Sequence, residues 1–403
     1  MFAKLFVLFL LAGSSSVLAN DLDQQIQFWE KKRAIDPEDF ISPTKLGELY
    51  LKKARATGDL SANVEAEKNL RLALKKNPEH RAAVILLASA CIAQHKFSEA
   101  RAFAEKAVKM DPEDAFSTAV LGDACLELGD VARAESAYKK IVQLEPALAT
   151  HSRMANLHWI KGDPAAAIHS YDAAIRAGEA EDTAPADLAW CHVQQGEFYF
   201  RTGGFKKAEE RYTMALKLVP DYHFALDHVA ELRAAQGKYD EAISLYKKLI
   251  ERLPRPELQQ ALGDVCAFIQ KTAEAKQWHD RALASYLKAA ETGQVHYYHH
   301  LASFYADIQE NPKEALKWAR KDLELRTNVF AYDGLAWALY RNGEFGAARD
   351  AIKKALAVGT KEEQLLTHAG IIFVRAGDFD EGRKLLHQAA AINPRKDAFH
   401  LHR

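Results

Sequence analysis

The chain has 403 residues, of which 48% are hydrophobic and 27% are charged, which is typical of a globular protein and not of a disordered or fibrous one. The 54 Lys and Arg residues are balanced by 55 Asp and Glu residues, so no overall basic charge attracts nucleic acid. We therefore expect a folded protein without a nucleic-acid partner.

Residues 1–19 have the pattern of a secretory signal peptide. Lys4 supplies a positive charge, Leu5–Ala12 is an unbroken apolar run, and Val17-Leu18-Ala19 fits the cleavage rule. We expect cleavage after Ala19 and an exported protein, periplasmic or secreted. An uncleaved N-terminal anchor is the alternative reading, although the apolar run is short for a bilayer-spanning helix. No later stretch is apolar enough to span a membrane, so we expect no stable span after cleavage.

The residues that follow predict a single helix and then a repeat. Residues 20–39 contain an amphipathic stretch, Asp21–Ile35, which we expect to cap the front of the fold. Beyond it, Pro78, Pro112 and Pro146 follow one another at intervals of 34 residues. A period of this length, with small, aromatic and proline marks, predicts stacked pairs of antiparallel helices. Proline ends the second helix of a pair because it cannot continue it.

Residues 40–396 divide into about eight to ten repeats. They span Phe40–His80, Arg81–Asp114, Ala115–Ala147, Leu148–Leu188, a fifth that closes at Pro220, a sixth that closes at Pro254, Pro256–Gln294, Val295–Asn328, Val329–Glu362 and Glu363–Lys396. We expect a lengthened turn around Ala54–Asn63 and a longer loop near Gly178–Pro185. Residues 397–403 form a tail too short for a full capping helix.

The best repeats carry marks that hold a common register. The third has Leu121-Gly122, Gly129, Ala134, Tyr138, Ile141 and Pro146; the fifth has Gly196, Tyr199, Gly203, Ala208, Tyr212, Ala215 and Pro220; the sixth has Ala230, Gly237, Ala242, Tyr246, Leu249 and Pro254. This pattern resembles the tetratricopeptide repeat family over nearly all of residues 40–396. The resemblance implies an all-α fold, a right-handed superhelical solenoid in which the first helices line a concave groove.

The repeat positions that face this groove in the family identify the candidate binding residues. They are Phe116, Asp123, Trp159, Trp190, Glu197, Phe200, Phe224, Asp227, Glu231, Asp264, His296, His299, Phe330, Asp333, Trp337 and Tyr340. Exposed aromatic side chains are frequent binding anchors, and neighbouring carboxylates favour a partner with Lys, Arg or a free amine. Arg201 and Arg341 interrupt this acidic character. We expect a protein or peptide partner and no small-molecule substrate.

One histidine cluster suggests a second kind of site. His296 and His300 lie four residues apart, so both could ligate one metal ion from the same helix face, with Asp307 or a neighbouring helix as a third ligand. The simpler interpretation is that His296 and His299 are polar groove surface and that His300 packs inside. We therefore assign no metal and no cofactor.

The four cysteines are expected to be buried free thiols and not disulfides. Cys91, Cys125 and Cys266 occupy the same repeat position, and equivalent positions of adjacent repeats lie on the order of 10 Å apart. A disulfide needs Cα atoms within about 7 Å. Cys191 is less clearly placed, and the sequence does not settle the redox state of any of the four.

No catalytic motif stands out. The chain has no phosphate-binding loop, no dinucleotide-binding glycine pattern, no His-Glu-x-x-His and no Cys-x-x-Cys. It has no Asn-x-Ser/Thr sequon either, which weakly favours a bacterial exported protein. The leading hypothesis is a non-catalytic adaptor that binds a protein segment in its groove. The alternatives are a structural or assembly component of an envelope export complex, and a metal or small-ligand carrier using the helix with His296, His299 and His300.

Overall fold

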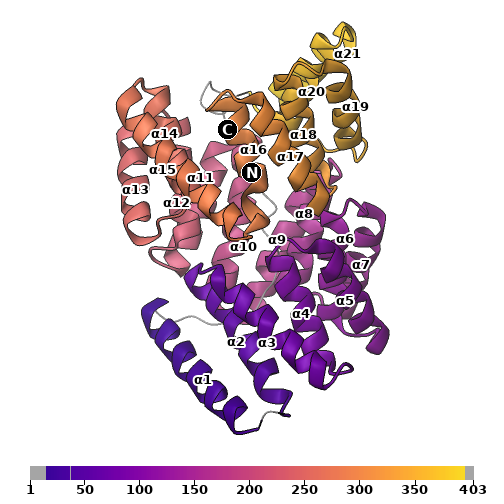
Figure 1. Cartoon of the computed structure of the whole chain (residues 1–403). Coiled ribbons are helices and arrows are strands. Elements are labelled where there is room, and N and C mark those ends of the chain that lie inside the picture. The colour runs from indigo at the N-terminus through magenta and orange to yellow at the C-terminus, as the bar shows by residue number, and fades with distance from the viewer. Residues whose placement is uncertain (1–14, 37, 395–403) are drawn as a thin grey trace. The chain divides into compact units, whose positions relative to one another are not determined.

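The computed structural model describes residues 15–36 and 38–394, and all regular secondary structure in that part of the chain is helical (Figure 1). The helices are α1 (Ser15–Ile35), α2 (Ile41–Thr57), α3 (Ser61–Lys76), α4 (Arg81–Ala93), α5 (Phe97–Met110), α6 (Ala115–Glu127), α7 (Val131–Leu144), α8 (Leu148–Ile160), α9 (Pro164–Ala180), α10 (Pro185–Arg201), α11 (Phe205–Leu218), α12 (His223–Ala235), α13 (Tyr239–Arg252), α14 (Pro256–Phe268), α15 (Thr272–Glu291), a 3₁₀ turn (Val295–Tyr297), α16 (Tyr298–Asp307), α17 (Pro312–Leu325), α18 (Val329–Arg341), α19 (Phe345–Leu356), α20 (Glu363–Arg375) and α21 (Phe379–Ile392). The predicted all-α repeat solenoid is confirmed.

These helices form two compact units. The N-terminal unit comprises the described residues up to 154, together with 180–187. The C-terminal unit comprises 155–179 and the described residues from 188 on. No helix in the described part of the chain is both long and apolar enough to cross a membrane.

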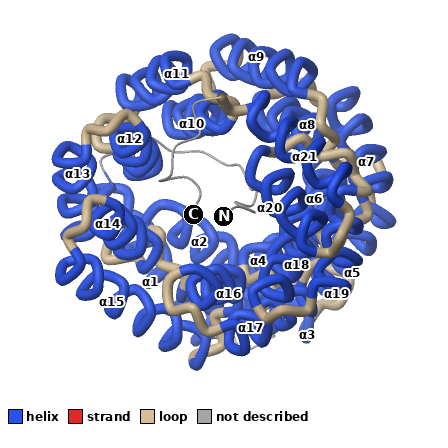
Figure 2. The backbone as a smooth tube through the Cα atoms, turned by 90° about the horizontal axis from the view of Figure 1, so that it is seen from above, coloured by secondary structure: helices blue, strands red, loops and turns tan. Residues whose placement is uncertain are grey.

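Helix pairs build both units. In the N-terminal unit α2 packs on α3, α4 on α5 and α6 on α7, and α1 packs on α2 through Leu22 and Ile26. In the C-terminal unit the pairs run from α12 and α13 to α20 and α21. Figure 2 shows α12, α14 and α16 on the inner side of that unit's curve and α13, α15 and α17 on its outer side. The first helices of successive pairs therefore share one surface.

Glycine allows the two helices of a pair to approach. A Cβ atom placed on Gly122 would lie 2.5 Å from the ring of Tyr138, and one placed on Gly196 would meet the ring of Tyr212. Both tyrosine side chains are buried, as is the equivalent Tyr246. The glycine and tyrosine of each repeat therefore contact each other, and the tyrosine ring occupies the space where glycine has no side chain.

Two predicted loops are shorter than expected. The insertion around Ala54–Asn63 partly extends α2, which runs to Thr57, because it begins with Ala54, Arg55 and Ala56, all good helix formers. The loop near Gly178–Pro185 shrinks because α9 continues to Ala180 and α10 begins at Pro185, where proline is favoured as a first helical residue. The proposed cleavage site after Ala19 lies within α1, whereas residues 1–14 and 397–403 lie outside the described part.

The C-terminal unit closes on itself. The Thr360 hydroxyl donates a hydrogen bond to the carbonyl oxygen of Ile160, which is 200 residues away in sequence. Arg201 Nη1 lies 3.3 Å from Glu362 Oε1. The turns at Gly162 and Gly203 also approach Gly359 and Asn393 closely. The start of the last helix pair is therefore fastened to the turns that follow α8 and α10, a contact that the sequence repeat does not predict.

Candidate functional site

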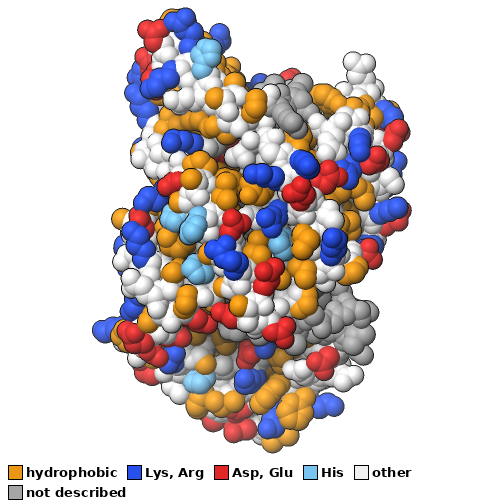
Figure 3. All heavy atoms as spheres, turned by 180° about the vertical axis from the view of Figure 1, so that it is seen from behind, with side chains coloured by type: hydrophobic (Ala, Val, Ile, Leu, Met, Phe, Trp, Pro, Cys, Tyr) orange, Lys and Arg blue, Asp and Glu red, His pale blue; other side chains and the backbone are white. Residues whose placement is uncertain are grey.

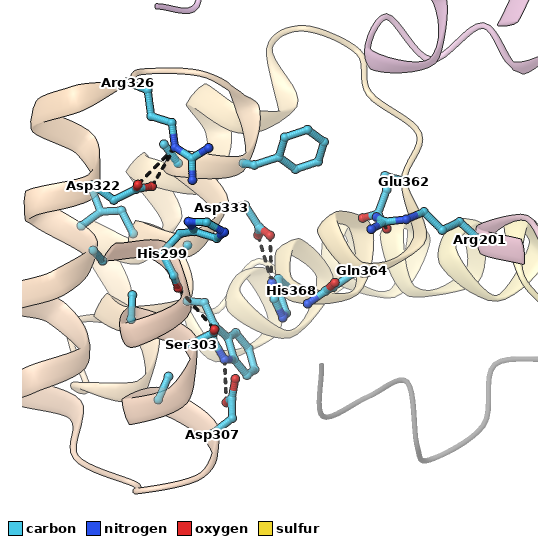
Figure 4. Close-up of a pocket in the computed structure, with 18 residues that line it drawn as sticks. Arg201, His299, Ser303, Asp307, Asp322, Arg326, Asp333, Glu362, Gln364 and His368 are labelled. Atoms are coloured by element: carbon cyan, nitrogen blue, oxygen red, sulfur yellow. Dashed lines mark hydrogen bonds and ion pairs between the residues drawn. The ribbon is translucent and has the colours of Figure 1, made fainter. Parts of the chain in front are cut away.

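A cavity in the C-terminal unit brings together four of the predicted groove residues. It has a volume of about 80 Å³ and is bounded by α16, α17, α18 and the start of α20, where Arg201 of α10 lies beside Glu362 (Figure 4). The predicted residues in its lining are His299, Phe330, Asp333 and Trp337. The others are Arg201, Ala302, Ser303, Ala306, Asp307, Ala319, Asp322, Arg326, Ala331, Gly334, Leu335, Glu362, Gln364 and His368.

Helical spacing explains which side chains of α18 reach the cavity. Phe330, Asp333, Gly334 and Trp337 are separated by three or four residues and so lie on one face of the helix. A Cβ atom added to Gly334 would find no atom within 4 Å. The cavity thus has open space directly above the α18 backbone, between a phenylalanine and a tryptophan.

Alanine residues of the neighbouring helices leave room for the cavity. Ala302 and Ala306 of α16, Ala319 of α17 and Ala331 of α18 all line the cavity and are themselves buried. The apolar floor is therefore made of methyl groups, and the cavity owes its volume to the absence of longer side chains at these positions.

Trp337 is held in place by its neighbours. Its indole Nε1 donates a hydrogen bond to Asp307 Oδ1 over 2.9 Å. Its ring stacks on His368, with centroids 4.2 Å apart and an interplanar angle of 13°, and on Tyr340, with centroids 4.9 Å apart. A side chain fixed in this way forms a rigid wall and would lose little rotational freedom on binding a ligand.

Three acid–base pairs line the cavity, as Figure 4 shows. His368 Nδ1 lies 3.0 Å from Asp333 Oδ1. Arg326 Nε lies 3.1 Å from both Asp322 oxygens, and both side chains of this pair are nearly completely buried. Glu362, 6% exposed, receives Arg201 on Oε1 and the backbone N–H of Leu365 on Oε2. The polar walls are therefore ordered by contacts within the protein.

The cavity is negatively charged overall. Its lining carries four carboxylates, from Asp307, Asp322, Asp333 and Glu362, against the two guanidinium groups of Arg201 and Arg326. Burial alone would lower the pKa of His368, but the Asp333 carboxylate, with Asp307 and Glu362 nearby, raises it above its ordinary value. Even with His368 protonated, the negative charges outnumber the positive ones.

The remaining predicted residues lie outside this cavity. Asp123, Glu197 and Phe200 are buried, and the other nine are half-buried: Phe116, Trp159, Trp190, Phe224, Asp227, Glu231, Asp264, His296 and Tyr340. The structure therefore gathers part of the predicted set at one place and distributes the rest along the repeats.

Asp123 belongs to a buried network of the N-terminal unit. Its carboxylate accepts the Tyr138 hydroxyl over 2.8 Å and the Arg153 Nε and Nη2 groups over 2.9 Å each. Arg153 is 3% exposed. This geometry joins consecutive repeats and favours a structural role for Asp123.

Several predicted residues of α8 to α14 are likewise engaged with their neighbours. Trp159 packs edge-on against Phe198 and lies under the Arg201 guanidinium at 5.3 Å. Glu231 Oε2 lies 3.2 Å from His228 Nδ1, and Asp264 Oδ1 lies 2.9 Å from His279 Nε2. These contacts fix the side chains of the first helices, and they include partners that the repeat frame does not identify.

The histidine cluster is split between two kinds of surroundings. His296 lies in the 3₁₀ turn against the Tyr297 ring, whereas His300 stacks on the buried Tyr286 with centroids 5.4 Å apart. Burial lowers the pKa of His296 to about 4 and that of His300 to about 3. Within residues 15–36 and 38–394, no three His, Cys, Asp or Glu side chains are arranged to hold a metal ion.

Arg255 and Glu257 form a charged pair on the start of α14. Burial opposes the charged form of Glu257, but the Arg255 guanidinium holds its pKa at about 2. The Tyr297 hydroxyl donates to the same carboxylate over 3.4 Å. This pair anchors the 3₁₀ turn that precedes α16, one of the helices of the cavity.

The four cysteines are all buried and free in the structure. Burial raises the pKa of Cys91 and Cys191 to about 12, and it also raises the pKa values of Cys125 and Cys266. Thiols of this kind are poor nucleophiles near neutral pH.

The predicted groove residues do not include most of the polar residues of the cavity. Asp322 and Arg326 lie on a second helix and in the link that follows it, and Glu362 lies in the link before α20, so the rule that selects first-helix positions passes over them. His368 lies on a first helix, α20, for which no groove residue was predicted. The one available signal was the four-residue spacing of Asp322 and Arg326, which is typical of a helical ion pair.

Charges are interspersed on the face of the molecule that Figure 3 shows. On the face shown in Figure 3, basic and acidic side chains alternate and neither kind forms a broad patch. This agrees with the nearly equal numbers of acidic and basic residues.

Comparison with known families identifies the repeat. Models described as tetratricopeptide repeat match residues 61–119, 93–149, 152–198 and 225–261. A curated human relative, protein O-mannosyl-transferase TMTC1, is 30% identical over 135 residues. That match covers 33% of this chain and only 14% of the relative, about one seventh of its length.

Solved helical-repeat structures are similar at low identity. A human IFIT1 dimer with PPP-AAAA is 15% identical, with 94% of this chain and 86% of that chain covered and a TM-score of 0.48. Yeast Tom70 is 15% identical, with 90% and 93% covered and a TM-score of 0.37.

Proposed function

Because the chain is a tetratricopeptide repeat protein, we propose that it is a non-catalytic scaffold whose C-terminal unit binds a segment of a partner protein across α16, α18 and α20. The observation that carries this proposal is the cavity that these first helices share. Phe330 and Trp337 supply apolar anchoring surface, and the surrounding carboxylates supply hydrogen-bond acceptors. Interfaces commonly concentrate their binding energy in such aromatic anchors.

Preorganisation supports the same function. Trp337 is held by Asp307, His368 and Tyr340, and Asp333 is oriented by His368. A bound segment would therefore meet walls whose rotamers are already selected, which reduces the entropy lost on association.

Export forms the second part of the proposal. The charged start, the apolar run and the cleavage pattern of residues 1–19 support a secretory signal. N-terminal sequencing of the protein isolated from its source tests this. A mature N-terminus at Asn20 is expected, and a protein that retains Met1 would contradict cleavage.

Peptide selection tests the binding surface. Residues 20–403 would be used to select from a displayed library of random peptides, and the affinities of the selected peptides would be measured by fluorescence anisotropy. Gly334→Leu places a side chain into the open space of the cavity, where an added Cβ atom meets nothing within 4 Å, and it should abolish binding.

Gly346→Leu is the matched control. Gly346 is also a helical glycine with nothing within 4 Å of an added Cβ, but it lies exposed on α19, a second helix. Peptides that bind the wild type and both variants equally would place the binding surface elsewhere and overturn the proposal.

A further inference from the structure

We propose that the cavity receives the side chain of an arginine or lysine residue of the bound segment. This inference rests on the proposed function, because it names the part of the partner that enters the cavity. It follows from two separate properties of the lining, its charge and its shape.

The four carboxylates of the lining differ in their surroundings. Of the four carboxylates, Asp322 is closed off by Arg326, and Glu362 is bound by Arg201. Asp333 is bound by His368, and Asp307 accepts from the neutral Trp337 indole, with Arg341 Nε at 4.0 Å. Arg341 also lies 3.7 Å from Glu310, so its charge is shared between two acids. A cation that enters the cavity would therefore meet a lining in which carboxylates outnumber guanidinium groups.

The guanidinium groups of the lining do not favour an anion instead. Arg326 is 2% exposed and directs its Nε–H to the carboxylate one helical turn before it. Arg201 is held between Glu197, at 3.1 Å, and Glu362, at 3.3 Å. An anionic ligand would also face Asp307 and Asp333, so like-charge repulsion disfavours it.

The shape fits a long side chain with a polar end. The floor consists of alanine methyl groups and the open position above Gly334, and Phe330 and Trp337 form apolar walls. The aliphatic part of Lys or Arg packs well on such surface while its charged end stays near acceptors. A cavity of about 80 Å³ also exceeds the roughly 10–15 Å³ that one water molecule requires.

Fluorine NMR of the full chain labelled with 5-fluorotryptophan gives a direct readout. The chain has six tryptophans, and Trp337→Phe identifies the signal that belongs to Trp337. The probe is N-acetyl-arginine amide, titrated to about 50 mM because a single side chain is expected to bind only in the millimolar range. N-acetyl-citrulline amide, which has the same shape without the charge, is the control probe.

The arginine probe should shift the Trp337 signal saturably, whereas the citrulline probe should shift it at least about tenfold less. Gly334→Leu should remove the effect and Gly346→Leu should preserve it. Asp307→Asn keeps an acceptor for the Trp337 indole and removes one charge, so it should raise the Kd of the arginine probe roughly tenfold. Equal shifts with the two probes, or no shift with the arginine probe, would overturn the proposal.

A peptide arm separates this inference from the function on which it rests. Each Arg or Lys of a selected peptide is replaced by citrulline or norleucine. If the peptides bind, are lost with Gly334→Leu, and tolerate all these replacements, the binding surface stands and the cationic pocket is refuted. If the arginine probe binds while no peptide does, the pocket stands and the proposed scaffold function fails.

Discussion

Asp123, Tyr138 and Arg153 illustrate how a residue at a groove position can serve the core instead. Asp123 was predicted as a binding residue from its place in the repeat. Its carboxylate instead accepts hydrogen bonds from the buried Tyr138 hydroxyl and the buried Arg153 guanidinium. The repeat frame describes one helix pair at a time, whereas Arg153 comes from the next pair. Partners across repeats depend on the neighbour's sequence, so they are not visible in the register of a single repeat.

Removing Arg153 should be costly. Arg153→Met leaves the Asp123 carboxylate buried without its cation, and we expect the free energy of unfolding to fall by about 3–5 kcal/mol. Chemical denaturation followed by circular dichroism measures this change.

The triple variant Arg153→Met, Asp123→Leu, Tyr138→Phe provides the control, because it removes all three polar groups together. It should recover most of the loss, since apolar replacement of a complete buried ion pair is often neutral. A triple variant no more stable than the single one would show that the network itself stabilises the unit.

The Asp333–His368 pair should make stability depend on pH. The groups that face His368 are Asp333 from α18, Asp307 from α16 and Glu362 before α20, and together they raise its pKa above the ordinary value of about 6.5. The stabilisation by protonated His368 is therefore fully present below about pH 6.5 and is lost as pH rises through the raised pKa of the folded state.

Asp333→Asn should flatten that part of the profile. Thermal unfolding of wild type and variant, measured from pH 5 to about pH 9, gives the difference. If the thermal midpoints of the wild type and the variant fell by the same amount above neutral pH, His368 would not be the group responsible.

At the scale of single helices, most of the fold follows from the sequence. The helix pairs of the third, fifth and sixth repeats were predictable because glycine, alanine, tyrosine and proline marks coincide in each. The extension of α2 and the start of α10 at Pro185 do not follow from the repeat consensus, because they depend on local helix propensity. The cavity could be found only in part, since Phe330, Asp333 and Trp337 follow from first-helix spacing while Asp322 and Glu362 enter from other segments.

Two glycine substitutions separate packing glycines from open ones. Gly334→Ala should raise the free energy of unfolding by up to about 1 kcal/mol, because alanine is a better helix former and its methyl group enters empty space. Gly122→Ala should lower it by about 1–3 kcal/mol, because the new methyl group would collide with the Tyr138 ring. Urea unfolding measures both, and a change of the same sign in the two variants would contradict the packing described here.

For the C-terminal unit as a whole, the closing contacts alter how stability is distributed. Stacked repeats normally contact only their neighbours, so their stability is close to a sum of local terms. Thr360 and Glu362 instead reach Ile160 and Arg201, far away in the sequence. Loosening the start of the last helix pair should therefore also destabilise the turns after α8 and α10.

Hydrogen exchange measures this coupling. In the double variant Thr360→Val, Glu362→Gln, the backbone amides of residues 160–163 and 201–204 should exchange faster than in the wild type, because their packing partner is released. Thr213→Val, which removes an exposed hydroxyl that bonds only within α11, is the control and should leave those segments unchanged. Unaltered protection in the double variant would show that the closing contacts carry little energy.

The same closure limits how this chain can evolve in length. Helix α9 and five helix pairs, α10 and α11 through α18 and α19, lie between the turn after α8 and the link that meets it. Open solenoids can gain or lose a whole repeat by duplication or deletion, because each new end is equivalent to the old one. Here an added or missing pair would carry Thr360 away from Ile160 by the width of a repeat, on the order of 10 Å. Relatives that keep this fastening should therefore conserve the number of repeats between its two sides, even where the sequences of those repeats diverge.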